Sequence, residues 1–242
     1  METLFFELAS ENRLGILREL QSKPLRMQDV VQKLDMNDTE VFRQLHRLSE
    51  ALLIKRQPEG TYAITEYGKL VLRLSLPLHF AYRNRQNLLT RDVWGLPDEF
   101  IDRLGELSEA KVSTDVIEIV NLSGQGIAAA QDHIWVMSDK PLDSARVKVE
   151  EQVSKGIKLR FLFPENQRPL FKGFREVPEI VEKRTLPRIP VNLVCTEKVA
   201  GVSLLSIDQR PDIALFFGTS GAFLNWASDL FLHYWNQGHH TY

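Results

Sequence analysis

The sequence predicts an α+β protein of two domains, in which a helical domain with a small β-hairpin precedes an α/β layered domain. The chain has 242 residues, which is long for one domain and a usual length for two. Helical apolar periodicity dominates its first third, whereas short apolar runs typical of strands alternate with helical patterns after it. The helical pattern ends at the glycine and proline of RDVWGLP (91–97), so we expect domains at 1–92 and 93–242.

Composition limits the class of protein. Hydrophobic residues at 43% and charged residues at 26% are ordinary for a soluble globular protein. There is no apolar run of about 18 residues, and the acidic N-terminus METLFFELASENR lacks the basic segment of a signal peptide, so we expect a cytoplasmic protein without a membrane partner. The single cysteine, Cys195, excludes an internal disulfide and a thiolate cluster, and the six histidines are dispersed. We therefore predict no metal site and no cofactor.

The charge is unevenly distributed. The net charge is −2, yet residues 1–91 carry 14 Lys and Arg against 11 Asp and Glu, which leaves 16 against 21 for the rest. The mildly basic half is therefore the N-terminal one, as expected if only that half meets DNA.

The first elements are predicted from apolar spacing. The stripe within Leu4–Leu20 predicts a first helix, which Ser10–Arg13 interrupts, and Pro24 separates it from a short second helix at Met27–Leu34. The third helix, Asn37–Leu52, buries one face at spacings of four, three and four, and Asn37 with Glu40 outlines a capping box. Two short strands follow at Leu53–Arg56 and Thr61–Ile64, with a polar tip between them.

Helix, turn, helix and β-hairpin, in that order, form a winged helix-turn-helix. The polar face of Asn37–Leu52 carries side chains that donate to phosphates and base edges in a major groove, namely Arg43, Gln44, His46 and Arg47. A merely solvated basic face is the alternative for an isolated helix, and the flanking elements favour DNA binding instead. We expect Arg43 and Arg47 to make most contacts from this helix, and Lys55 and Arg56 at the base of the hairpin to contact the DNA backbone.

The helix after the hairpin predicts a dimer. Thr65 is a plausible N-cap for a helix that runs through Leu76, and Pro77 is expected to kink or restart it before the helical segment Leu78–Leu89. The apolar surface of Leu4–Leu20 and Leu70–Leu89 exceeds what one small domain can bury, so either a dimer partner or the second domain must cover it. We therefore expect a homodimer that binds double-stranded DNA.

Residues 1–75 resemble the ArsR-type winged-helix regulators of bacteria and archaea. The resemblance rests on LFFELASENRLGILREL, on Leu34–Leu48 and on GTYAITEYGK. It implies that Thr39, Arg43 and Gln44 face DNA. The paired cysteines of metal-sensing members are replaced here by Met27-Gln-Asp-Val-Val31, which argues against thiolate metal sensing, and Asp35 occupies the turn, where a small residue is usual.

The second half alternates strand and helix patterns. Strands are expected at His133–Ser138, Ile157–Phe163, Val191–Cys195, Gly201–Ile207 and Asp212–Phe217, and helices at Leu96–Leu107, Thr114–Gln131, Pro141–Lys155, Phe171–Lys183 and Ala222–Gln237. GIKLRFLFP (156–164), GVSLLSID (201–208) and FLNWASDLFLHYW (223–235) resemble the C-terminal domain of the methanogenesis regulatory protein family. That resemblance implies an archaeal transcriptional regulator with a sensing domain, and, by analogy of fold only, a relation to phospholipase-D halves.

Motifs for catalysis are missing. Phospholipase-D chemistry needs a histidine with a lysine two residues on, and neither His79 nor His133 has one. GTSG (218–221) lacks the spacing of a hydrolase nucleophile turn, and SGQG (123–126) is followed by no lysine that would bind a phosphate. We expect no enzymatic activity, and a phosphodiesterase-like hydrolase is the disfavoured alternative.

Aromatic residues concentrate in the strands and last helix of the second domain. They form either a core or the walls of a pocket for a small organic effector, and we expect such a pocket between the sheet and the last helix, with Trp135 and Phe163 opposite that helix. The candidate effector-binding residues are Trp135, Arg160, Phe163, Trp226, Asp229 and Trp235. The sequence thus predicts a dimeric, sequence-specific transcriptional regulator modulated by an effector or partner, and the competing interpretation is a winged-helix module for protein–protein contact.

Overall fold

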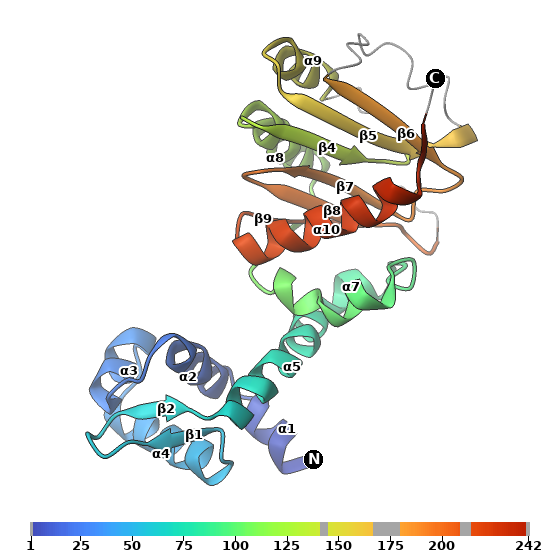
Figure 1. Cartoon of the computed structure of the whole chain (residues 1–242). Coiled ribbons are helices and arrows are strands. Elements are labelled where there is room, and N and C mark those ends of the chain that lie inside the picture. Colours follow the sequence, from blue (N-terminus) through green and yellow to red (C-terminus); the bar gives the residue numbers. More distant parts are fainter. Residues whose placement is uncertain (1, 141–144, 167–179, 209–213, 241–242) are drawn as a thin grey trace. The chain divides into compact units, whose positions relative to one another are not determined.

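The computed structural model describes residues 2–140, 145–166, 180–208 and 214–240, and it divides into two compact units, Met1–Leu78 and His79–Tyr242 (Figure 1). The predicted fold class is confirmed, because the first unit is helical with a hairpin and the second is built on a large sheet. The division falls earlier than the expected boundary at 92/93. Phe80 packs into the core of the second unit and Arg91 forms a β-bridge with Ser206, so 79–92 belongs to that unit.

The first unit has the predicted order of helix, turn, helix and hairpin. Its core is made largely by α2 and α4, with Ile16, Leu17, Val41, Leu45 and Leu48 all fully buried. In chain order the elements are α1 (Glu2–Leu8), α2 (Glu11–Ser22), α3 (Met27–Leu34), α4 (Asp38–Glu50), β1 (Ile54–Arg56), β2 (Tyr62–Ile64) and α5 (Glu66–Arg83), which continues into the second unit.

Short polar side chains set the ends of these helices. The Ser10 side chain caps α2, which explains why the first apolar stripe is two helices rather than one. Asn37 Oδ1 accepts from the backbone N–H of Glu40 at 2.8 Å and so caps α4. Asp35 ends α3 in the left-handed conformation (φ 49°, ψ 46°), which aspartate tolerates better than most residues, so the turn is made without a glycine.

The hairpin is held against the helices at both of its strands. β1 and β2 are antiparallel, with Ile54 opposite Ile64 and Arg56 opposite Tyr62, and Leu25 bridges to Tyr62 on the far side of β2. The first turn of α5 approaches this region so closely that a Cβ atom at Gly68 would lie 2.0 Å from the carbonyl oxygen of Leu53. Glycine is therefore required where α5 leaves the hairpin.

Helix α5 contains Pro77 within its span of Glu66–Arg83. Of the two outcomes expected at Pro77, a restart is wrong, because the helix continues for six residues beyond it, and a kink stays a prediction. A proline removes one backbone hydrogen bond, and the other bonds of an 18-residue helix can maintain it through such a position.

The second unit is an α/β layered domain. Its helices are α6 (Arg85–Leu88), α7 (Asp98–Asp102), the 3-10 helix η1 (Leu104–Leu107), α8 (Val116–Ala128), α9 (Arg146–Ser154) and α10 (Gly221–Gln237). Its strands are β3 (Lys111–Ser113), β4 (His133–Met137), β5 (Lys158–Pro164), β6 (Val181–Leu186), β7 (Val191–Thr196), β8 (Ala200–Leu204), β9 (Leu215–Gly218) and β10 (His239–His240).

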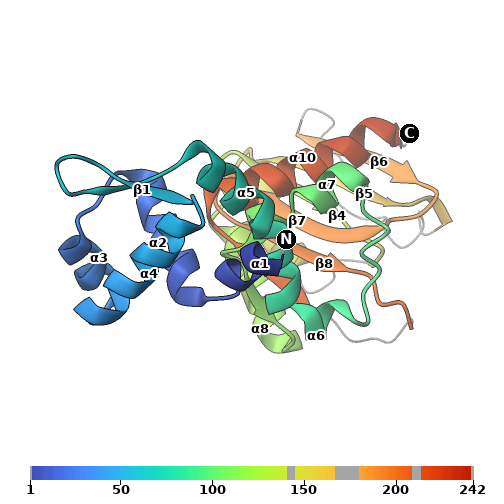
Figure 2. The same cartoon turned by 90° about the horizontal axis from the view of Figure 1, so that it is seen from below.

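These strands form one mixed sheet in the order β10-β6-β5-β4-β7-β8-β9-β3. The neighbours β4, β5 and β6 are parallel and the other pairs are antiparallel. Helix α10 covers one face and α8 the other, as Figure 2 shows. Each face therefore has its own core, one built around Trp226 and Phe231 of α10 and the other around Ile127 of α8 and Val149 of α9.

Three strands, β3, β6 and β10, were not predicted from the sequence. Residues 181–183 belong to β6 and are not helical, so this part of the predicted helix Phe171–Lys183 is wrong, and 171–179 lie outside the described residues. VEKRTL has a weak apolar pattern because β6 is flanked by β5 and by the two-residue β10, and its charged side chains remain partly exposed. Strands β3 and β10 are too short to give an alternating pattern in the sequence.

Candidate functional site

Helix α4 presents a continuous exposed surface, which we call the outward face. It consists of Thr39, Phe42, Arg43 and His46, and both Phe42 and Arg43 lie three or four residues from Thr39 and from His46, so each neighbours those two on the helix. The side chains of Arg43 and His46 are 67% and 60% exposed, and Phe42 is 58% exposed. Thr39, Arg43 and His46 thus lie where a partner can reach them, as predicted, and Phe42 is an addition that the sequence analysis omitted.

The basic side chains of the outward face are loosely paired. Arg43 Nη2 lies 3.8 Å from Glu40 Oε1, and His46 Nδ1 lies 3.3 Å from Glu50 Oε2. Exposed ion pairs of this kind contribute about 0–1 kcal/mol, so either side chain can exchange its carboxylate for another acceptor at little cost.

The expectation that Gln44 is exposed on α4 is wrong. Its side chain is buried, and Oε1 accepts from Arg13 Nη1 of α2 at 2.9 Å, while Nε2 donates to Glu40 Oε1 at 3.3 Å. Gln44 precedes the fully buried Leu45 and lies on the side of α4 that faces α2. Its amide joins two helices of the first unit.

Arg47 is also held by the protein itself. Arg47 Nη2 donates to Glu7 Oε1 of α1 at 2.7 Å, and its guanidinium lies 4.8 Å from the centre of the Phe6 ring. Its side chain is only 35% exposed, half the value of Arg43. Arg47 is therefore less available to DNA than predicted, and Arg43 is the principal free arginine of α4.

Glu7 also forms an ion pair with Arg13, whose Nε donates to the Glu7 backbone carbonyl oxygen at 2.8 Å, and Glu7, Arg13 and Arg47 together form a buried cluster beneath α4. Arg13 Nε lies 2.9 Å from Glu7 Oε2, and the side chains of Glu7 and Arg13 are only 6% and 7% exposed. Burial lowers the pKa of the Arg13 guanidinium, the Glu7 carboxylate raises it, and the charge of Arg47 lowers it further. An arginine remains charged even so, which leaves two guanidinium groups against one carboxylate. No spacing in the sequence links Glu7 and Arg13 to Arg47, because the contact joins three helices.

Both basic residues of the hairpin are exposed, as expected. Lys55 and Arg56 are consecutive residues of β1, so their side chains leave the hairpin on opposite faces. Ile54 is buried on the same face as Arg56. A duplex that lies against one face of the hairpin therefore meets one of the two side chains directly.

Three of the six candidate effector residues have structural roles. Trp226 is fully buried, and its Nε1 donates to the carbonyl oxygen of Phe100 at 3.1 Å. Phe163 packs with Phe161 on the face covered by α8 and α9, because alternate residues of β5 point to opposite faces, so the prediction that it lies opposite α10 is wrong. Asp229 Oδ2 accepts from Arg103 Nη2 at 2.7 Å, and its carboxylate is thus held in an ion pair.

The other three come together around one arginine. The Arg160 guanidinium lies 5.7 Å from the Trp135 ring centre and 5.4 Å from that of Trp235, and its Nε donates to Glu182 Oε1 at 3.0 Å. Phe231 stacks against both tryptophans at 5.1 and 5.5 Å. This cluster is a packed assembly of one cation and three aromatic rings.

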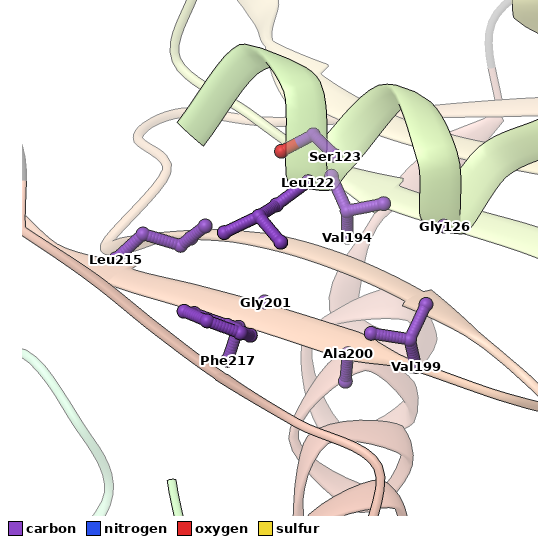
Figure 3. Close-up of a pocket in the computed structure, with 9 residues that line it drawn as sticks. All are labelled: Leu122, Ser123, Gly126, Val194, Val199, Ala200, Gly201, Leu215 and Phe217. Atoms are coloured by element: carbon purple, nitrogen blue, oxygen red, sulfur yellow. The ribbon is translucent and has the colours of Figure 1, made fainter. Parts of the chain in front are cut away.

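A cavity of about 50 Å³ lies elsewhere, between α8 and the sheet (Figure 3). It is lined by Leu122, Ser123, Gly126, Val194, Val199, Ala200, Gly201, Leu215 and Phe217, none of which is a candidate effector residue. Sites for small organic ligands usually have volumes of about 300–1,000 Å³, so this cavity does not replace the predicted effector pocket.

Neither a metal-binding cluster nor a membrane-spanning helix is found in the described part of the chain. It contains no group of three or more His, Cys, Asp or Glu side chains placed to hold a metal ion. None of its helices combines the length and the apolar character needed to cross a membrane. Cys195 is buried in the core of the second unit, and burial raises the pKa of its thiol.

The first unit is similar to one described domain. Residues 1–79 match the family model of the HVO_A0261 N-terminal domain, which ends one residue beyond the first unit. No curated protein matches the chain.

Several solved structures are similar in fold at low sequence identity. TrmBL2, described as an archaeal chromatin protein with a novel mode of DNA binding, is 12% identical, with 96% of this chain and 94% of that chain covered and a TM-score of 0.49. The phospholipase D family member Nuc from Salmonella typhimurium is 11% identical over 55% of this chain and 97% of its own, with a TM-score of 0.40. NucT from Helicobacter pylori is 13% identical over 55% and 98%, with a TM-score of 0.42.

Proposed function

We propose that this protein is a DNA-binding transcriptional regulator that inserts the outward face of α4 into a major groove. The observation that carries the proposal is the combination of an exposed, N-capped helix bearing Thr39, Arg43 and His46 with a basic hairpin directly after it. The ArsR-type resemblance of residues 1–75 and the match of residues 1–79 to the HVO_A0261 N-terminal domain are consistent with it.

Arg43 is the residue to which we assign direct reading of a base. An arginine side chain bonds to O6 and N7 of guanine through two donors, and each such pair discriminates by about 1–3 kcal/mol. Arg43 is available for this pairing because its contact with Glu40 is long and exposed. Thr39 and His46, three or four residues away, reach neighbouring groups in the same groove.

We assign Arg47 a role other than the base contact expected from the sequence. Its contacts with Glu7 and Phe6 fix α1 against α4. In the proposed complex Arg47 adds positive charge beside the phosphates while remaining bound to Glu7, so its contribution is electrostatic attraction and not base recognition.

We also propose that the regulator acts as a homodimer through α5. Leu70, Leu74 and Leu78 recur at intervals of four residues on one side of this helix and are 54%, 64% and 61% exposed. A stripe of exposed leucines is the kind of surface that a second copy of the chain covers. A two-fold dimer places two α4 helices about 34–36 Å apart on one side of DNA, which requires a nearly palindromic site.

A protein-binding winged helix is the competing function, and exposed Phe42 is the observation that favours it. DNA and protein partners differ in salt dependence. Neutralising several phosphates makes affinity fall steeply with salt, whereas an apolar protein contact depends on salt only weakly.

The test of the proposed function is selection of duplexes from a random DNA library with the full-length chain, followed by affinity measurements on the enriched site. We expect Arg43→Ala to weaken binding by about 1–3 kcal/mol and to relax the preference at one base pair in each half-site. Arg18→Ala, which removes an exposed arginine of α2, is the matched control and should bind like the wild type. Absence of any enriched sequence, or equal effects of the two variants, would refute the proposal.

A further inference from the structure

Phe42 is an apolar side chain in the middle of a polar surface. It is 58% exposed and lies between Thr39, one turn before it, and His46, one turn after it. Its ring centre is 6.5 Å from that of His46. The two residues can therefore approach the same ligand together.

Packing of the first unit does not account for a phenylalanine at this position. The core side of α4 is formed by Val41, Leu45 and Leu48, each with no exposed surface, and Phe42 points about 100° away from Val41 around the helix. Removing the Phe42 ring would leave the core unchanged, so its chemistry is available for a partner.

The partner chemistry follows from the surface on which Phe42 lies. A major groove presents hydrogen-bonding groups at every base pair but only one apolar group, the 5-methyl of thymine. Resting on the proposed DNA-binding function, we propose that Phe42 contacts a thymine methyl group and sets a preference for T·A at one base pair of each half-site. It is a specificity-determining residue of the outward face.

The position of Arg43 predicts where that thymine lies. Consecutive Cα atoms are about 3.8 Å apart, close to the ~3.4 Å spacing of base pairs along the duplex. Their side chains diverge by about 100° around the helix, so Phe42 and Arg43 reach different but nearby base pairs of one half-site. The enriched site should contain a thymine within two positions of the guanine that Arg43 contacts.

The experiment replaces each thymine of the selected duplex, one at a time, with deoxyuridine, which removes the methyl group and keeps base pairing. For the wild type we expect about fourfold weaker binding at one position per half-site, the factor that corresponds to losing burial of one methyl group. Phe42→Ala should bind the thymine and uracil duplexes equally. Phe5→Ala, which removes a phenylalanine of α1 that is 52% exposed, is the matched control and should keep the fourfold difference.

The outcomes separate this inference from the function on which it rests. Binding of the wild type with no sensitive thymine, or a fourfold difference that persists in Phe42→Ala, overturns the role of Phe42 and leaves DNA binding intact. Failure of the wild type to bind any duplex refutes the proposed function as well. Phe42→Leu provides a second variant, since its smaller apolar side chain should retain part of the discrimination, and circular dichroism checks that each variant is folded.

Discussion

Truncation of Leu74 in the middle of the exposed stripe on α5 should dissociate the proposed dimer. Leu74 is the most exposed of the three leucines, so it has the most surface to lose to a second copy. Leu74→Ala keeps the helical propensity of the position, because alanine is the best helix former. Any change in association therefore reports on the contact and not on helix stability.

The size of the effect follows from the exposed fraction. Leucine carries three more carbon atoms than alanine, each CH₂ contributes about 0.8 kcal/mol when it is buried, and 64% of Leu74 is exposed in the single chain. Complete burial in a dimer is thus worth about 1.5 kcal/mol per protomer and about 3 kcal/mol in a two-fold interface, where each residue occurs twice. The dimer dissociation constant should rise about 100-fold.

Sedimentation equilibrium over a range of protein concentrations measures this constant. Leu52→Ala is the matched control, because Leu52 is 69% exposed in the same unit but does not lie on α5. We expect it to leave the dimer unchanged. A wild-type chain that is monomeric at micromolar concentration, or equal weakening by the two substitutions, would refute the assignment of the interface.

Three further predictions concern the buried cluster, the hairpin and the second unit. Glu7→Gln removes the carboxylate shared by two arginines and should lower the free energy of unfolding, measured by urea denaturation, by about 2–4 kcal/mol. The DNA affinity should fall as well if Arg47 loses its position. An unchanged denaturation midpoint would contradict this prediction. Lys55 and Arg56 point to opposite faces of the hairpin, so only one of the variants Lys55→Ala and Arg56→Ala should reduce the slope of log affinity against log salt concentration by about one unit. Equal slopes for the two variants would disprove this. Burial raises the pKa of Tyr234 to about 12, above its unfolded value of about 10. The neutral hydroxyl is therefore favoured in the folded state, and its contribution of about 2–3 kcal/mol to the free energy of unfolding is complete below about pH 10. This contribution is lost as the pH rises from about 10 to about 12. Ultraviolet titration of wild type and Tyr234→Phe measures this, and a difference spectrum that titrates near pH 10 would be inconsistent with the burial.

The parts of the fold that were predicted correctly depend on local interactions. Helix α3 has the predicted bounds, and α4 begins at the predicted cap, because apolar spacing and capping involve residues within one or two turns. The hairpin was recognised for the same reason, since its turn and strands are contiguous. Signals of this kind can be recognised within a short segment of the sequence, without knowledge of distant contacts.

The errors have a common physical cause, which is contact between distant segments. Gln44 was predicted to contact DNA because it lies on the polar face of α4 when that helix is considered alone. In the folded unit, Arg13 of α2 packs against Gln44 and covers it. Phe163 was assigned to the face of α10 because the register of β5 in the sheet was unknown, and register decides which alternate residues point to which side. Phe42 was overlooked because an apolar residue next to the buried Val41 is expected to be buried as well. Only the packing of α4 shows that Phe42 is exposed.

The central claim is that the outward face of α4 lies against DNA, and cross-linking from Thr39 tests it most directly. A photoreactive benzophenone side chain is introduced at Thr39 in the full-length chain, with the same group at the exposed Arg18 of α2 as the control. After irradiation with the selected duplex, we predict that the Thr39 variant cross-links to bases within each half-site and that the Arg18 variant does not. A Thr39 variant that cross-links only to protein, or an Arg18 variant that cross-links to the duplex in its place, would contradict the account.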